Sequence, residues 1–227
     1  MNRAFGVLTL MMMAAVQQPS PPADVVGSIQ GVVIDEDRKP ISDANVYGIP
    51  EGRDLRNWIW VTADIAGKFT LQNFPVGNAY LHAFKESDGY ANNFFAFYMN
   101  TARKPVNVEI KPGAVTSGVT IQLGPKAAYL KVNATDEKGV PVPVTCHLDR
   151  DGLPGPYSTS VGTDPRLVGG GFITGSMLVP PAPFRLTVLA DGYEPWHYGR
   201  ATYAGKAGLI TLKSSQTLSL AVRLRKK

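Results

Sequence analysis

The sequence predicts an all-β protein made of two tandem, seven-stranded Greek-key β-sandwiches. The first observation behind this prediction is an internal repeat of about a hundred residues. An Asp-Glu pair, three turn residues, a proline and a β-branched residue occur at 35–41 and again at 136–142. Gly-Tyr pairs follow in both copies, at 89–90 and 192–193. A repeat of this length is too long for a solenoid unit and matches a whole small β-domain.

The second observation is the regular succession of short alternating runs and turn signals every 8–12 residues, typical of a Greek-key sandwich. The third is that no helical period of useful length is found. In the first copy we expect strands at 28–35, 44–49, 58–63, 68–71, 79–85, 106–110 and 119–123. In the second we expect strands at 129–134, 144–149, 171–178, 184–189 and 218–224, with weaker ones besides.

The chain divides at turn-rich and proline-rich segments. We expect a signal peptide at 1–16, a proline-rich spacer at 17–26, a first sandwich at 27–124 (module one) and a second, divergent one at 127–225 (module two). The first segment has a positive Arg3 and then thirteen mainly apolar residues, which is too short to span a bilayer and fits an export signal. We therefore expect a secreted or periplasmic protein of the cell envelope. An uncleaved N-terminal anchor is the alternative.

Charge and cysteine content exclude several classes of function. The net charge of +5 is concentrated at the C-terminal end, and no basic stripe with interleaved aromatic residues predicts nucleic-acid binding. Attachment of that end to an anionic surface is the alternative to a simply solvated terminus. Cys146 is the only cysteine, so no intrachain disulfide forms, and its place in the alternation predicts a buried side chain.

Module one resembles a known family. Its opening Gly31-x-Val33-x-Asp35, its central Asp64-x-x-Gly67-x-Phe69 and its later Lys111-Pro112-Gly113 are similar to the carboxypeptidase regulatory-like domain. The resemblance covers nearly all of module one. Module two keeps the Asp136-Glu137 turn but has a longer segment in place of the central motif.

This resemblance implies a transthyretin-like, immunoglobulin-like sandwich, often grouped with carbohydrate-binding folds. Modules of this family are generally not catalytic and occur beside peptidases, receptors and surface proteins. The resemblance thus implies a binding or regulatory role rather than an enzyme. Fold alone does not supply function, so the residues must carry the site.

Aromatic residues form the main candidate ligand site. Trp58 and Trp60 lie one strand period apart, so both rings share a face, while Ile59 and Val61 fill the other. Exposed coplanar rings stack on sugars or bury against a partner. The further candidates for the site are Tyr80, His82, Phe84 and Tyr98. The alternative is that these aromatics cover the open end of module one or pack between the modules.

Catalytic and metal sites are weak by comparison. The acids at 35–37 and 149–151 lack the bidentate Glu of a calcium loop, and the three histidines are scattered along the chain. We expect no metal and no cofactor. No Ser-His-Asp arrangement, phosphate loop or redox motif is found.

We therefore expect an exported, non-enzymatic binding module with a carbohydrate or cell-wall glycan ligand. The alternative is a scaffold for another envelope protein, such as a peptidase or a transporter. We expect no nucleic-acid partner and no membrane span after the signal is removed.

Overall fold

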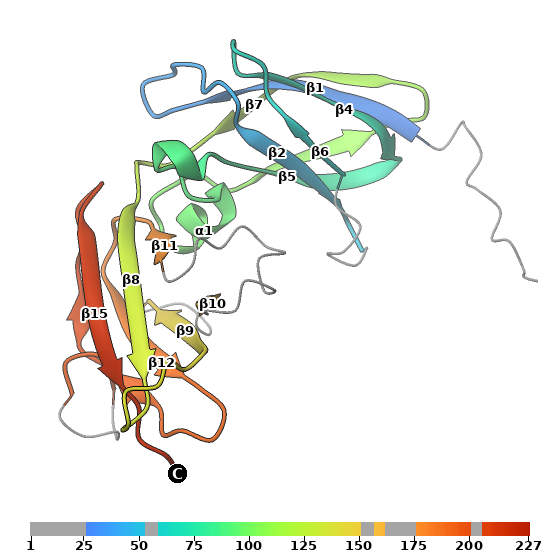
Figure 1. Cartoon of the computed structure of the whole chain (residues 1–227). Coiled ribbons are helices and arrows are strands. Elements are labelled where there is room, and N and C mark those ends of the chain that lie inside the picture. The colour runs from blue at the N-terminus through green and yellow to red at the C-terminus, as the bar shows by residue number, and fades with distance from the viewer. Residues whose placement is uncertain (1–25, 53–58, 151–156, 162–175, 201–205) are drawn as a thin grey trace, which may run out of the picture.

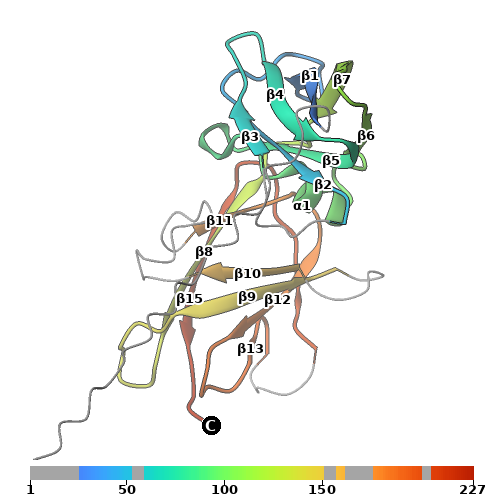
Figure 2. The ribbon, with the colours of Figure 1, turned by 90° about the vertical axis from the view of Figure 1, so that its right-hand side faces the viewer.

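The computed structural model describes residues 26–52, 59–150, 157–161, 176–200 and 206–227, with the backbone alone described at 157–161. The predicted signal peptide, nearly all of the spacer, and Trp58 lie outside these residues. The described chain forms two β-sandwiches joined at an angle, with one short helix at the junction (Figures 1 and 2). None of the helices in this part is long and apolar enough to cross a membrane.

Module one contains seven strands in two sheets. One sheet has the order β4-β1-β7, and the other has the order β3-β2-β5-β6. Strand β7 runs parallel to β1, whereas the other pairs are antiparallel. The strands are β1 (Val26–Ile34), β2 (Asn45–Pro50), β3 (Ile59–Thr62), β4 (Lys68–Pro75), β5 (Gly77–Phe84), β6 (Val106–Ile110) and β7 (Val115–Gln122).

Module two repeats this topology. Its sheets have the orders β11-β8-β15 and β10-β9-β12-β13, with β14 also paired to β12. Strand β15 is parallel to β8, as β7 is to β1. Two short strands, β13 and β14, thus take the place of β6. The strands are β8 (Ala128–Thr135), β9 (Val144–Asp149), β10 (Tyr157–Val161), β11 (Ser176–Val179), β12 (Phe184–Leu189), β13 (Trp196–His197), β14 (Leu209–Ile210) and β15 (Thr217–Arg223). The all-β, two-sandwich fold class is confirmed.

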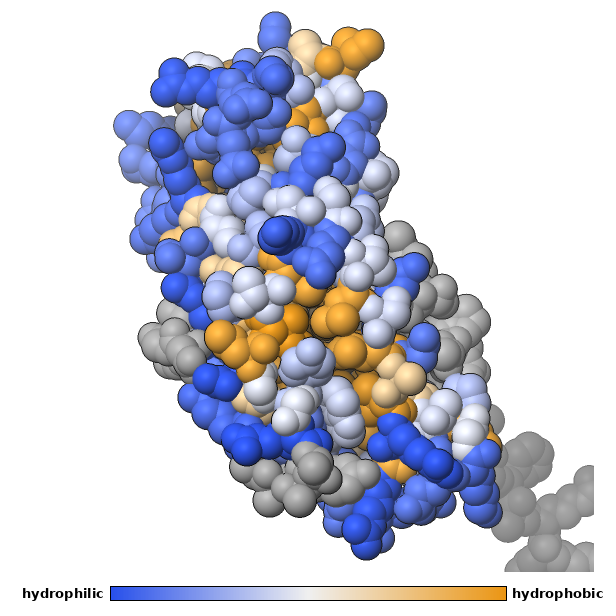
Figure 3. Space-filling view, turned by 90° about the vertical axis from the view of Figure 1, so that its left-hand side faces the viewer, coloured by the Kyte–Doolittle hydropathy of each residue, from blue (hydrophilic) through white to orange (hydrophobic). Residues whose placement is uncertain are grey.

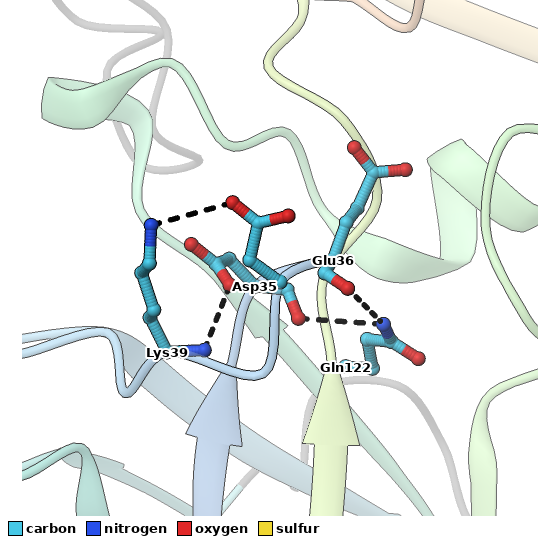
Figure 4. A network of polar contacts seen from close by, with 5 residues as sticks. Asp35, Glu36, Lys39 and Gln122 are labelled. Atoms are coloured by element: carbon cyan, nitrogen blue, oxygen red, sulfur yellow. Dashed lines mark hydrogen bonds and ion pairs between the residues drawn. The ribbon is translucent and has the colours of Figure 1, made fainter.

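The repeated Asp-Glu motif forms the same turn in both modules. The Asp35 carboxylate accepts the backbone N–H of Lys39 at 2.9 Å, and the Asp136 carboxylate accepts that of Val140 at 2.8 Å. Figure 4 shows the first turn, where Gln122 of β7 also donates to the carbonyl oxygen of Asp35 at 3.3 Å. An aspartate that accepts backbone N–H groups stabilises such a turn. This use of the carboxylates gives the recurring motif a structural role in both modules.

A third copy of the turn lies at the central motif of module one. The Asp64 carboxylate accepts the backbone N–H of Lys68 at 2.8 Å, and Gly67 adopts a left-handed φ of 70°. A Cβ at Gly67 would lie 2.7 Å from the carbonyl oxygen of Val33, so a larger residue would meet both strain and a clash. The glycine of the Asp-x-x-Gly motif is therefore required by the backbone conformation of the turn.

The helix α1 (Asn93–Tyr98) was not expected from the sequence. It follows the one-turn 3-10 helix η2 (Glu86–Asp88), and the side chain of Asn92 caps it by accepting the N–H of Phe94 at 2.9 Å. The Asn93 side chain accepts the backbone N–H of Ala83 in β5 at 3.1 Å, which ties the helix to module one.

The opposite side of α1 enters the other module. Phe95 (5% exposed) and Met99 (0%) belong to the hydrophobic core that module two forms with residues such as Leu130 and Leu186. The Arg150 guanidinium also donates to the carbonyl oxygen of Tyr98 at 3.3 Å, and the N–H of Ala127 donates to Gly89 at 2.8 Å. The two modules therefore share a packed junction.

Apolar side chains are partly exposed to solvent at one edge of module two. Leu218 and Leu220 of β15 face the core but are only partly buried, because β15 is the last strand of its sheet. Figure 3 views the molecule from the side of β15 and β8, and apolar atoms reach the surface in its lower half between hydrophilic borders.

Because Met99 lies in the core of module two, we expect this side chain of module one to stabilise module two. Met99→Ala is expected to lower the free energy of unfolding by about 2–5 kcal/mol, because it removes a fully buried side chain and leaves a cavity. Urea unfolding followed by circular dichroism measures the change. Phe97→Ala, on the exposed side of the same helix, is the control and should cost much less. Equal losses for the two variants would contradict this packing.

Candidate functional site

The candidate site is a row of aromatic residues across the outer face of the β3-β2-β5 sheet. Strand register places Trp60 opposite Tyr47, and Tyr47 opposite His82. Residues directly opposite in neighbouring strands project from the same face. We call these three residues and Phe94, which contacts His82, the aromatic surface.

Trp60 is the exposed end of the row. Its side chain is 68% exposed, while Ile59 and Val61 pack against the core of module one, as the alternation predicted. Among the described strands, β3 is at the edge of its sheet. Trp60 therefore presents the largest apolar area of the row to a ligand.

His82 is the buried end of the row. Its ring stacks on Tyr47 at a centroid distance of 4.9 Å and meets the Phe94 ring edge-on at 5.6 Å. The side chain is only 5% exposed, and its Nδ1 atom has no hydrogen-bond partner among the described residues. Burial lowers the pKa of His82 to about 4, which a hydrogen bond with Asn93 opposes. The imidazole is thus neutral at pH 7.

Tyr47 connects the two ends. Its hydroxyl accepts a hydrogen bond from the Asn92 amide at 2.6 Å, and its ring meets Phe84 edge-on at 6.3 Å. Burial raises the pKa of Tyr47, opposed by the hydrogen bond from Asn92. The tyrosine is therefore held by the cap of α1 on one side and by ring packing on the others.

The remaining predicted residues lie around this row. Tyr80 and Phe84 are half-buried on the outer face, with Ala79, Leu81 and Ala83 turned to the core. Tyr98 is not beside them: it packs at the junction, against the core of module two. The sequence indicated that aromatics could pack between the modules, and Tyr98 and Phe95 do so.

Sequence reasoning missed Tyr47 and the helix α1, whose exposed side carries two aromatic residues. Phe94 is 47% exposed and Phe97 is 40% exposed, and these two lie three residues apart on one helix face. The signal for Tyr47 was available, because Ala44 and Val46 are core residues and the alternation turns residue 47 outward. Its pairing with Trp60 and His82 required the strand register.

Two side-chain amides lie in the rows next to the aromatic one. Asn45 lies opposite Phe84, and Asn107 lies opposite Tyr80, so each belongs to a row next to the aromatic one. Aromatic planes with neighbouring amides can stack and donate or accept hydrogen bonds. The imidazole of the row, His82, is buried, so it is shielded from a ligand at the exposed end of the row.

Module two carries a polar row on its corresponding outer face. His147 lies opposite Thr187, and Thr187 lies opposite His197. The histidines that are far apart in the sequence are thus brought to one face, whereas His82 belongs to the other module. Within the described residues, no group of three or more His, Cys, Asp or Glu side chains could hold a metal ion.

Cys146 lies on the inner face of the same sheet. It is fully buried, and burial raises the pKa of its thiol to about 12. The thiolate form that a nucleophile needs is therefore absent at neutral pH.

Comparisons with known proteins give distant structural likeness only. No protein-family model matches the chain, and no curated protein has a matching sequence. The TIE protein of Bacillus anthracis is similar over 89% of this chain and 34% of its own, with 13% identity and a TM-score of 0.34. A streptococcal ancillary pilin is similar over 89% of this chain and 63% of its own, with 12% identity and a TM-score of 0.36. A DUF3823 family protein of Bacteroides ovatus is similar over 82% of this chain and 100% of its own, with 14% identity and a TM-score of 0.32.

The chain therefore spans about a third of the first of these proteins and less than two thirds of the second.

The burial of His82 predicts a pH-dependent stability. The unfolded chain takes up a proton near pH 6.5, while the folded chain does so only near pH 4. The folded state is therefore fully stable above pH 6.5 and loses stability as the pH falls towards 4, by at most about 3 kcal/mol. Urea unfolding across this range should show the loss, and His82→Phe should reduce it. If the free energy of unfolding of His82→Phe fell with pH as steeply as that of the wild type, the attribution of this loss to His82 would be contradicted.

Proposed function

We propose that the chain is an exported, non-catalytic binding protein whose aromatic surface binds carbohydrate, with cell-wall glycan as the main candidate ligand. The observation that carries the proposal is Trp60, whose indole is 68% exposed at the end of an ordered aromatic row. A flat apolar ring stacks on the apolar face of a sugar, and an exposed ring that continues a row of other aromatic residues is typical of a binding surface.

The side chains around Trp60 are held in fixed positions, which supports this proposal. Tyr47 is fixed by the Asn92 hydrogen bond and by stacking on His82, so the sheet next to Trp60 is rigid. A surface that is already ordered loses little conformational entropy on binding. Asn45 and Asn107 in the adjacent rows supply amide donors and acceptors for hydroxyl groups.

The resemblance of module one to carboxypeptidase regulatory-like domains is part of the same proposal. Its motifs correspond to built features: Gly67 has a left-handed φ of 70° in the Asp64 turn. Gly113 in the Lys111-Pro112-Gly113 turn has a φ of 63° and donates to the carbonyl oxygen of Val26 at 2.9 Å. Export rests on the composition of residues 1–16.

Trp60→Ala tests the site directly. It should weaken binding to insoluble peptidoglycan or another polysaccharide of a panel about tenfold or more, because a central aromatic contact contributes above 1 kcal/mol. Thermal stability should change little, since the side chain is exposed. Pull-down with quantified free protein measures the affinity. Ile65→Ala, 91% exposed in the Asp64 turn, is the matched control and should bind normally.

Two outcomes would count against the proposal. Equal affinity of Trp60→Ala and the wild type would show that the site is elsewhere. A folded wild-type protein that binds no polysaccharide of the panel would refute carbohydrate binding itself.

A second function, as a scaffold for another envelope protein, is favoured by the exposed side of α1. Phe94 and Phe97 together form an apolar helix face, and such faces pack into grooves of protein partners. A Phe94→Ala/Phe97→Ala double variant should lose co-purifying envelope proteins. Phe97→Ala alone leaves the aromatic surface intact, so it should weaken co-purification while keeping any glycan affinity. Val115→Ala, 54% exposed on β7, is the control. Unchanged co-purification by the double variant would contradict this function.

A further inference from the structure

Two of the three histidines in the chain lie in one row on the outer face of module two. Their shared neighbour is Thr187 of the central strand β12, which is opposite His147 of β9 on one side and His197 of β13 on the other. The inner face of the sheet is fixed by Cys146 and Val188, both fully buried in the core. Both imidazoles therefore project from the outer face.

The distance between these histidines allows them to converge. Two strand spacings separate their backbones by about 10 Å, with only the short Thr187 side chain between them. Both histidines are half-buried rather than fully exposed. Imidazole rings that lean over a threonine from both sides can direct one nitrogen each towards a common point.

A hydrogen bond already orients one ring. The Nδ1 atom of His197 lies 3.1 Å from the Oγ1 atom of Thr187. When Nδ1–H donates to this oxygen, the Nε2 atom of His197 keeps its lone pair for a ligand. Metal-binding histidines usually have their other ring nitrogen held in this way, which fixes the tautomer and the ring orientation.

A charged pair lies in the row next to the histidines. Asp149 and Arg185 lie opposite each other in the next outward row, and the Arg185 guanidinium donates to the carbonyl oxygen of Ala207 at 2.6 Å. The arginine is thus drawn towards the 206–210 segment, on the β14 side of the sheet.

We propose that His147 and His197 form a binding site for a divalent transition-metal ion, oriented by Thr187. Neutral imidazole is a preferred ligand for copper, nickel and zinc, and copper(II) binds such nitrogen sites most tightly of the three. Two protein ligands leave the other coordination positions to water, so the site takes up and releases its ion readily. This site is independent of the aromatic surface on module one.

The proposal is tested on untagged full-length protein, because His82, His147 and His197 are then its only histidines. Titration with copper(II), followed by NMR of the imidazole resonances, should broaden the signals of His147 and His197 first. His82 is the internal control: it is 5% exposed in the other module and should remain sharp at the same metal concentration. Calorimetry should give one saturable site.

Variants separate the site from adventitious binding. His147→Gln and His197→Gln should each abolish the saturable site. Thr187→Val keeps the side-chain shape and both ligands but removes the orienting hydroxyl, so it should weaken binding about 10-fold. Early broadening at other residues, saturable binding retained by the His147→Gln/His197→Gln variant, or no binding by the wild type would overturn the proposal.

Discussion

The helix α1 is the constraint on which the arrangement of this molecule depends. Its Asn93 is hydrogen-bonded to β5 of module one, while its Phe95 and Met99 lie in the core of module two. A six-residue helix has little stability of its own, so it exists because both modules hold it. The same helix supplies Asn92 to Tyr47 and Phe94 to His82. The junction and the aromatic surface are therefore one structural unit.

The two modules share their inner architecture and differ on their outer faces. The Leu123 N–H donates to the carbonyl oxygen of Ile34 at 2.9 Å, and the Leu224 N–H donates to that of Thr135 at 2.8 Å, a hundred and one residues later in both cases. Core packing and turn chemistry restrict these positions. Outward side chains of the larger sheet lie outside these cores. Aromatic rings occupy this face in module one, and histidines, threonine and a charged pair occupy it in module two.

Most of the strands could be predicted because their signal is local. The bounds of the strands at 106–110, 144–149 and 184–189 agree with the alternation of apolar residues and the adjacent turns. The helix could not be predicted in this way, since Phe94, Phe95 and Phe97 cover several of its sides and its stability comes from distant residues. The orientation of Trp60 followed from alternation, but its pairing with Tyr47 and His82 depends on register.

For the histidines, too, one position follows from local sequence and the other depends on strand pairing. Alternation indicates that His147 faces outward, but His197 is in a two-residue strand that has no pattern of its own. Its position is set by pairing with Thr187 and by Trp196, which packs against the core. Sequence motifs detect ligands that are close together in one turn or one helix. They cannot detect a site whose residues come from three strands and are brought together only by the strand register.

The exposure along the aromatic row limits the affinity that the surface can have. Exposure rises from 5% at His82 and 9% at Tyr47 to 68% at Trp60, so a ligand meets one full indole face and the edges of its neighbours. One aromatic contact and a few amide hydrogen bonds are worth a few kcal/mol, which corresponds to roughly millimolar binding. Such affinity is weak for a free sugar but sufficient on a polymer, where many identical sites are presented at high local concentration. The proposed glycan function therefore requires an extended polymer as the ligand rather than a free sugar.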